Sequence, residues 1–116
     1  MTDATAAAGC SPGRYRLGDV EVELTAENRV QIAGTRQLAG SALRMDRGVE
    51  NLMRFAGLNL GRALRMATVN PACAAGLADR RGFLRPGDAA DLVLFRFDPS
   101  LPRITVEKTI VAGRTV

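Results

Sequence analysis

The strongest constraint on the fold is an amphipathic stretch, residues 42–57, that directly follows the four residues Leu38-Ala39-Gly40-Ser41. Its apolar positions are Met45, Val49, Leu52, Met53 and Ala56, and its polar positions are Arg44, Asp46, Arg47, Glu50, Asn51 and Arg54. Because the apolar positions follow helical spacing, we predict a helix with one face turned toward a core. Ser41 is the expected N-cap of this helix, and Gly57 is its expected left-handed stop.

The four residues before this helix are predicted to form a loop. A loop of small residues at a helix N-terminus is a place where a ligand can approach bare backbone. The alternative is a tight turn with no binding role, and the stretch taken alone favours that alternative.

Alternating residues predict short strands before the helix. Val20, Val22 and Leu24 alternate with polar neighbours, which is the pattern of a half-buried strand. Gly18-Asp19 fits a two-residue hairpin loop, so we expect residues 15–17 to pair with residues 20–24. The alternation continues at Val30 and Ile32, after a turn at Asn28.

Two shorter helices are predicted after Gly57. Asn59 is the expected cap of a helix over residues 60–67. Asn70-Pro71 is the expected start of a short helix that ends at Gly76. We interpret Cys73, on that short helix, as a small buried residue.

The last third of the chain is predicted to be turns and strands. Residues 79–90 are rich in turns, among them Gly82 and a type II turn at Pro86-Gly87. The apolar run in residues 91–97 predicts a strand covered on both faces or most of the way. Residues 104–111 and 115–116 predict a final hairpin. Since strands precede and follow the helices, we expect one composite sheet built from both ends of the chain.

Composition is that of an ordinary globular domain. With 116 residues, 47% of them apolar and 24% charged, the chain can bury one core but is too short for two ordinary domains. Its net charge of +4 is spread without a basic block or interleaved aromatic residues, which argues against nucleic-acid binding. No apolar run approaches the ~20 residues that cross a bilayer, so no membrane association is predicted.

The cysteine and histidine content limits which catalytic groups and metal ligands the chain can supply. Cys10 and Cys73 lie far apart in the sequence, so we interpret them as reduced thiols of a cytoplasmic protein. The first residues lack the pattern of a secretory signal. The chain has no histidine, so it cannot supply an imidazole base or the histidine ligands that most hydrolytic zinc sites use.

Four segments resemble a known enzyme family by their content and order. They are Met1-Thr2-Asp3-Ala4-Thr5-Ala6-Ala7-Ala8-Gly9, Leu38-Ala39-Gly40-Ser41-Ala42-Leu43, Leu64-Arg65-Met66-Ala67-Thr68-Val69-Asn70-Pro71-Ala72 and Gly82-Phe83-Leu84-Arg85-Pro86-Gly87-Asp88-Ala89-Ala90-Asp91-Leu92. Over essentially its whole length the chain resembles the C-terminal part of the N-acetylglucosamine-6-phosphate deacetylases, a family of metal-dependent amidohydrolases. The last segment identifies only the amidohydrolase superfamily, whereas the first two together point to the deacetylase branch.

The resemblance implies an α/β or α+β fold. It is the fold of a C-terminal fragment of a (β/α)8 amidohydrolase barrel, with the last strand and its helices, joined to strands of a small β-sandwich. Residues 1–12 would end the last barrel strand and carry an active-site loop. Residues 13–34 and 79–116 would be sandwich strands, and residues 35–78 the helical barrel segment.

The resemblance also implies a reaction and its residues. The family hydrolyses the N-acetyl group of N-acetylglucosamine 6-phosphate to acetate and glucosamine 6-phosphate, with a divalent metal such as zinc. Asp3 matches the catalytic acid/base, although by composition alone it would be a helix cap or a surface carboxylate. Leu38, Ala39 and Gly40 match the substrate-binding loop. The family's metal ligands, a glutamate and two histidines, match no residue here, so we expect the chain alone to bind no metal.

Three interpretations stay open. The chain is a fragment of a deacetylase that is inactive alone, half of a split enzyme completed by a partner chain that carries the missing barrel, or a non-catalytic binding or assembly module. Family members commonly dimerise, so a homodimer is also compatible with the resemblance. For the isolated chain we predict an exposed apolar face at Met45, Val49, Leu52 and Met53, because these residues would pack on absent barrel elements.

Overall fold

The computed structural model describes residues 2–77 and 84–116. The chain forms two compact units, Met1–Gly48 and Val49–Val116. The part of the predicted turn-rich segment that includes Gly82 lies outside the described residues. None of the described helices is long and apolar enough to cross a membrane.

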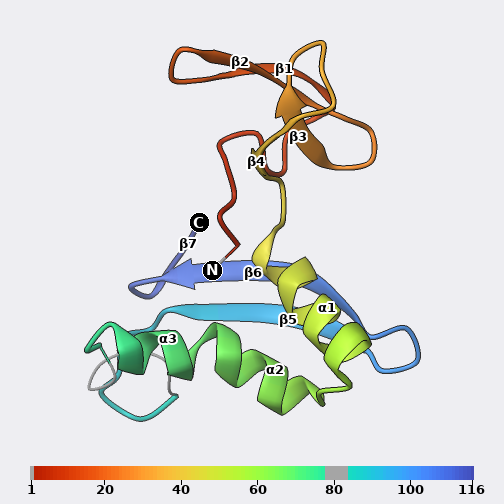
Figure 1. Ribbon diagram of the computed structural model, residues 1–116. Coiled ribbons are helices and arrows are strands. Elements are labelled where there is room, and N and C mark those ends of the chain that lie inside the picture. Colours follow the sequence, from red (N-terminus) through yellow and green to blue (C-terminus); the bar gives the residue numbers. More distant parts are fainter. Residues whose placement is uncertain (1, 78–83) are drawn as a thin grey trace. The chain divides into compact units, whose positions relative to one another are not determined.

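The first unit is built on a four-stranded antiparallel sheet with the strand order β1-β2-β3-β4 (Figure 1). The strands are β1 (Gly13–Leu17), β2 (Val20–Leu24), β3 (Arg29–Ile32) and β4 (Leu38–Ser41). Leu17 lies opposite Val20 across a turn in which Gly18 has a φ of +59°. The predicted first hairpin is therefore confirmed, as is the turn at Asn28, where φ is also +59°.

One face of this sheet covers a small core. Val22, Leu24 and Val30 are buried there together with Ala7 from the N-terminal segment. Ala39 of β4 packs against the same cluster. Burial of apolar surface therefore holds the N-terminal segment against the sheet that contains β4.

The segment Leu38–Ser41 is a strand, and the prediction that it forms a loop is wrong. It pairs with β3, with Arg29 opposite Ser41, across a bulge. This pairing satisfies backbone groups that the edge of β3 would otherwise leave open. Ser41 is consequently not the N-cap of the long helix; its hydroxyl accepts a hydrogen bond from the Leu43 N–H at 2.9 Å, and the helix begins at Met45.

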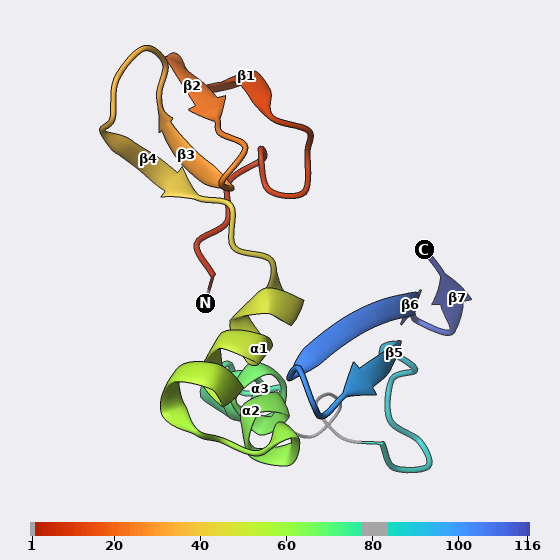
Figure 2. The same ribbon diagram turned by 90° about the vertical axis from the view of Figure 1, so that its right-hand side faces the viewer.

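The second unit packs helices against a three-stranded antiparallel sheet with the order β5-β6-β7 (Figure 2). Its strands are β5 (Leu92–Asp98), β6 (Arg103–Val111) and β7 (Arg114–Thr115). The helices of the chain are α1 (Met45–Ala56), which begins at the end of the first unit, α2 (Leu60–Ala67) and α3 (Val69–Ala74). Phe95 and Phe97 of β5 pack on the core that α1 and α2 share with the sheet.

The prediction that the apolar face of α1 is exposed is right for Met45, which is 50% exposed, and wrong for the central residues of the helix. Val49 and Met53 are buried with Ala63 of α2 and Ile104 of β6. Leu52 packs against the same cluster. The second unit therefore supplies the apolar partners that we expected from absent barrel elements.

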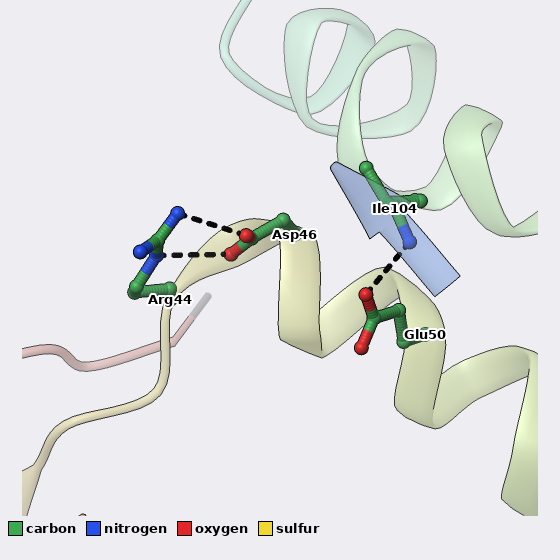
Figure 3. Close-up of polar contacts among 4 residues, drawn as sticks. All are labelled: Arg44, Asp46, Glu50 and Ile104. Atoms are coloured by element: carbon green, nitrogen blue, oxygen red, sulfur yellow. Dashed lines mark hydrogen bonds and ion pairs between the residues drawn. The ribbon is translucent and has the colours of Figure 1, made fainter. Parts of the chain in front are cut away.

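Glu50, which the helical pattern places on the polar side of α1, is also buried. Its side chain is only 4% exposed, and its Oε1 accepts a hydrogen bond from the Ile104 N–H at 2.8 Å (Figure 3). This bond joins α1 to the start of β6. A buried carboxylate is tolerated because it is hydrogen-bonded.

The predicted C-terminal stop of α1 and the predicted N-cap of α2 are confirmed. Gly57 follows α1 with a φ of +64°. The Asn59 Oδ1 accepts a hydrogen bond from the Arg62 N–H at 2.9 Å and so caps α2. The stop at Gly57 and the cap at Asn59 depend on residues within one helical turn. Sequence spacing could therefore predict them.

The third helix differs from the prediction. It begins at Val69 after Thr68, so Asn70 is inside the helix and is not its cap. Pro71 is tolerated in this first turn because the N–H groups there have no intrahelical partner. Cys73 is exposed, contrary to our interpretation, because the short helix contributes no buried residue.

The strands form two separate sheets rather than the predicted composite sheet. Each sheet pairs strands that are consecutive in the chain, so hairpins outcompete pairing between the two ends. The last hairpin, β6 with β7, is confirmed. The predicted cover on both faces of β5 is wrong, because Val93 and Leu94 are 53% and 47% exposed.

The predicted turn at Pro86-Gly87 is confirmed. The Asp88 N–H donates to the Arg85 carbonyl oxygen at 3.0 Å, and Gly87 has a φ of +94°. A positive φ at the third turn position is the requirement that glycine meets in a type II turn.

Candidate active site

Asp3 lies in the N-terminal segment, next to residues that pair with β4. Ala4 forms an isolated parallel bridge with Ser41. The Thr5 N–H donates to the Ser41 carbonyl oxygen at 2.9 Å, and the Thr5 hydroxyl donates to the same oxygen at 3.3 Å. The structure therefore brings the segment of Asp3 to the C-terminal end of Leu38–Ser41, the segment that contains the other three predicted site residues.

The conformation of Asp3 leaves its carboxylate open to solvent. The residue is exposed, and its φ of +51° lies in the left-handed region. Asp is one of the few residues other than Gly that adopt this region with some frequency. Water and a substrate can both reach an exposed carboxylate, as a general base requires.

Gly40 lies in close contact with the N-terminal segment. Its φ is +111°, and a Cβ built on it would collide with Cγ2, the methyl group of Thr5. Only a residue without a side chain permits this approach. Of the other two predicted residues, Leu38 is 66% exposed, whereas Ala39 is half-buried against the core of the first unit.

A cavity of about 520 Å³ lies beside β4. Leu38 and Gly40 line it, whereas Asp3 and Ala39 are not among its described lining residues. The volume falls in the range of small-molecule pockets, about 300–1,000 Å³. The cavity is thus large enough for a sugar-sized ligand and shares two residues with the predicted substrate-binding loop.

Three arginines, Arg29, Arg44 and Arg47, give the wall of this cavity a basic character. Arg44 forms a two-point ion pair with Asp46, with its Nε 3.2 Å from Oδ1 and its Nη2 2.9 Å from Oδ2 (Figure 3). Asp46 lies in the first turn of α1, where the helix dipole favours a carboxylate. The ion pair therefore offsets part of the positive charge at the cavity.

The described residues do not fit a divalent metal. Among residues 2–77 and 84–116, no group of three or more His, Cys, Asp or Glu side chains lies close enough together to hold a metal ion. Glu50, the buried carboxylate, is hydrogen-bonded to the backbone of β6. The donor set in the described part of the chain thus differs from the glutamate and two histidines that the family resemblance implies.

The chain belongs to the amidohydrolase family, whose sequence pattern matches residues 19–116. Over all of its 116 residues it is similar to the N-acetylglucosamine-6-phosphate deacetylases of Danio rerio and Homo sapiens, at 33% and 36% identity. The predicted resemblance is therefore confirmed, and these relatives are amide hydrolases. The chain spans 27% of the length of each of these two relatives.

Solved structures of deacetylases have a similar fold. N-acetylglucosamine-6-phosphate deacetylase from Pasteurella multocida matches 99% of the chain, with a TM-score of 0.79 and 29% identity, over 28% of its own length. An aspartate-to-alanine variant of the Mycobacterium smegmatis enzyme, in complex with N-acetyl-D-glucosamine-6-phosphate, matches with a TM-score of 0.75 and 35% identity. That match covers 99% of the chain and 29% of the variant. The mixed α/β class with antiparallel sheets is confirmed.

Sequence reasoning did not single out Thr5 or the arginines at the cavity. Thr5 is two residues from Asp3, but its importance depends on Ser41 and Gly40, which are distant in the sequence. The one local signal was Gly40 itself, because a glycine inside a strand often marks a close backbone approach.

Proposed function

We propose that the chain is the C-terminal part of an enzyme that hydrolyses N-acetylglucosamine 6-phosphate to acetate and glucosamine 6-phosphate. In this proposal Asp3 is the catalytic acid/base, and Leu38, Ala39 and Gly40 contact the sugar. The observation that carries it is the pairing of Ala4 and Thr5 with Ser41, which puts the segment of Asp3 beside β4. The similarity to deacetylases over the full chain supports the same reaction.

In this proposal Asp3 first accepts a proton and then donates the same proton. Its carboxylate accepts a proton from the water that attacks the amide carbonyl carbon, and a tetrahedral intermediate forms. The protonated side chain then donates that proton to the amide nitrogen, so the C–N bond breaks with a neutral amine as leaving group. The products are the free amino sugar and acetic acid, which ionises to acetate and releases its proton to the amine or to water.

The rest of the active site would come from outside these residues. The chain spans 27% of the length of its relatives. We therefore propose that the barrel strands, and the ligands of a divalent metal such as zinc, belong either to the same polypeptide or to a partner chain. The chain alone would then be inactive. The free, exposed thiols of Cys10 and Cys73 are compatible with the cytoplasmic location that we expect.

The proposal is tested with a complete enzyme, in which this chain replaces the matching part of the Mycobacterium smegmatis deacetylase. Asp3→Asn should lower kcat by about 10²–10⁴-fold, because an amide cannot accept the proton of the attacking water. KM and metal content should change little. Acetate release at varied substrate concentration measures both kinetic constants.

The matched control is Asp19→Asn, which removes an exposed carboxylate in the turn between β1 and β2. It should leave kcat unchanged. If Asp3→Asn retains a kcat within about threefold of the parent, an effect below ~1 kcal/mol, Asp3 is not the acid/base. An inactive parent chimaera with full metal content would instead favour the non-catalytic module.

A further inference from the structure

We propose that Thr5 is a positioning residue, which holds Asp3 at a set place relative to the backbone of residues 38–40. This inference rests on the proposed function, because it gives Thr5 a role only if Asp3 and the β4 segment act on one substrate. The contacts of Thr5 with β4 carry it. No other described residue of the N-terminal segment has both a backbone and a side-chain hydrogen bond to β4 among the contacts that the structure shows.

Thr5 makes three different contacts with the end of β4. Its N–H and its hydroxyl both donate to the Ser41 carbonyl oxygen, at 2.9 and 3.3 Å. Its methyl group lies against Gly40, in the space that a Cβ would need there. Since a β-branched side chain is stiff at χ1, the hydroxyl and methyl contacts hold one rotamer between them.

The distance along the chain from Thr5 to Asp3 is short. Two residues span at most about 7 Å when fully extended, so anchoring Thr5 limits where the Asp3 carboxylate can lie. The anchor point is on the same strand as Leu38, Ala39 and Gly40. Thr5 thereby couples the position of the proposed acid/base to the position of the proposed sugar contacts.

The N-terminal segment has a second attachment to the first unit besides the Thr5 side chain. Ala7, two residues further along, is fully buried in the core of the first unit and keeps the segment attached to the sheet. The hydrogen bond from the Thr5 N–H to the Ser41 carbonyl oxygen is made by the backbone, so Ala or Ser at this position can still form it. Loss of the Thr5 side chain should therefore loosen the placement of Asp3 without unfolding the unit.

The first test measures Thr5→Ala in the complete chimaeric enzyme. Misplacement of a catalytic group by about 1 Å can lower the rate on the order of 10²-fold, so we expect kcat to fall about 10- to 100-fold. KM should stay within about threefold, because the sugar contacts on β4 remain. Thr5→Ser, which keeps the hydroxyl and loses the methyl, should retain more activity than Thr5→Ala.

A positioning role is separated from a structural one by combining variants with Asp3→Asn. In the Asp3→Asn enzyme there is no acid/base left to position, so adding Thr5→Ala should change the residual kcat by less than about threefold. If Thr5→Ala lowers kcat by the same factor in both backgrounds, its effect is structural and the inference is wrong. Thr5→Ala with parental kcat would overturn it equally.

Contact with Gly40 is tested by rescue. Gly40→Ala should lower activity, because the new Cβ collides with the Thr5 methyl and because Ala is strained at a φ of +111°. The double variant Gly40→Ala with Thr5→Ser removes the colliding methyl and should be more active than Gly40→Ala alone. A double variant that is less active than Gly40→Ala would contradict the proposed packing.

The outcome for Asp3 keeps the two proposals distinguishable. If Asp3→Asn alone leaves kcat unchanged, both the proposed function and the proposed role of Thr5 are wrong. If Asp3→Asn lowers kcat but Thr5→Ala does not, the proposed function stands and only the inference about Thr5 is overturned.

Discussion

At the scale of single residues, burial decides what a polar side chain does. Glu50 is a charged residue on a helix, yet its carboxylate is buried and accepts the backbone N–H of Ile104 (Figure 3). Asp3 has the opposite environment, since its carboxylate is exposed. The first arrangement stabilises the second unit, and the second leaves a carboxylate available for chemistry.

Removal of the Glu50 carboxylate should destabilise the chain. Glu50→Ala leaves the buried N–H of Ile104 without this acceptor, which should cost about 1–3 kcal/mol in the free energy of unfolding. Glu50→Gln keeps a carbonyl oxygen as acceptor and should cost less. Urea unfolding followed by circular dichroism measures all three proteins.

The control for Glu50 is Glu21→Ala. The Glu21 carboxylate lies 3.7 Å from the Arg14 guanidinium, and both side chains are more than half exposed. Such a surface pair contributes at most about 1 kcal/mol. If Glu50→Ala and Glu21→Ala lower the free energy of unfolding equally, the hydrogen bond to Ile104 contributes nothing to stability beyond a surface ion pair.

Leu38 allows the proposed sugar contact to be tested apart from the core. It is 66% exposed and lines the cavity beside β4, whereas Ala39 packs on the core. In the complete chimaeric enzyme, Leu38→Ala should raise KM about three- to tenfold, with kcat nearly unchanged, because it removes binding and not chemistry. Steady-state acetate release measures both constants, and a loss confined to kcat would argue against the assignment.

At the scale of secondary-structure elements, short polar contacts organise the connections between strands. In the turn between β5 and β6, the Asp98 Oδ1 accepts hydrogen bonds from the Ser100 hydroxyl at 2.6 Å and from the Ser100 N–H at 2.9 Å. These bonds favour the ionised carboxylate, with the hydroxyl contributing most, and lower the pKa of Asp98 below its ordinary value.

This turn should therefore weaken in acid. Because the pKa of Asp98 is lower in the folded than in the unfolded chain, its contribution to stability is present above the unfolded pKa and is lost as the pH falls through the folded pKa. Ser100→Ala should raise the pKa of Asp98 toward its ordinary value, as measured by NMR titration of the carboxyl carbons.

Glu27 is the internal control in the same titration. Its pKa is lowered by a hydrogen bond from the Thr25 side chain, in a different turn, and should not respond to Ser100→Ala. If the pKa of Asp98 is unchanged in Ser100→Ala, the backbone N–H groups of the turn, and not the Ser100 hydroxyl, lower that pKa most.

At the scale of the whole molecule, the chain carries part of a proposed active site but no described set of metal ligands. Its sequence has no histidine, and no described group of three acidic or cysteine side chains could hold an ion. The chain also spans 27% of its deacetylase relatives. In the proposed function, the metal ligands would therefore come from outside the described residues.

The isolated chain should accordingly retain far less than one equivalent of zinc. After incubation with equimolar zinc and gel filtration, elemental analysis of the protein peak should show little metal, and no acetate should be released from the sugar phosphate. The complete chimaeric enzyme is the control and should retain metal. Nearly stoichiometric zinc on the isolated chain would contradict the expectation.

For the candidate site, the sequence suggested residues only through resemblance to a family. Asp3 by itself resembles any surface carboxylate, and the small residues 38–40 by themselves resemble a turn. Their segments meet because Thr5 pairs with Ser41, and that contact joins positions far apart in the chain. No periodicity or spacing within either segment contains this information.

The sequence by itself determined the features that depend only on residues a few positions apart. The turn at Gly18, the cap at Asn59 and the turn at Gly87 depend on neighbours one to three positions away, so propensity and spacing predict them. Only the tertiary structure decided that Leu38–Ser41 is a strand and that Glu50 is buried. The burial of Glu50 depends on Ile104 of β6, which is distant in sequence. The strand at Leu38–Ser41 depends on its pairing with β3 across a bulge and on the bond from the distant Thr5 to Ser41, contacts that satisfy backbone groups.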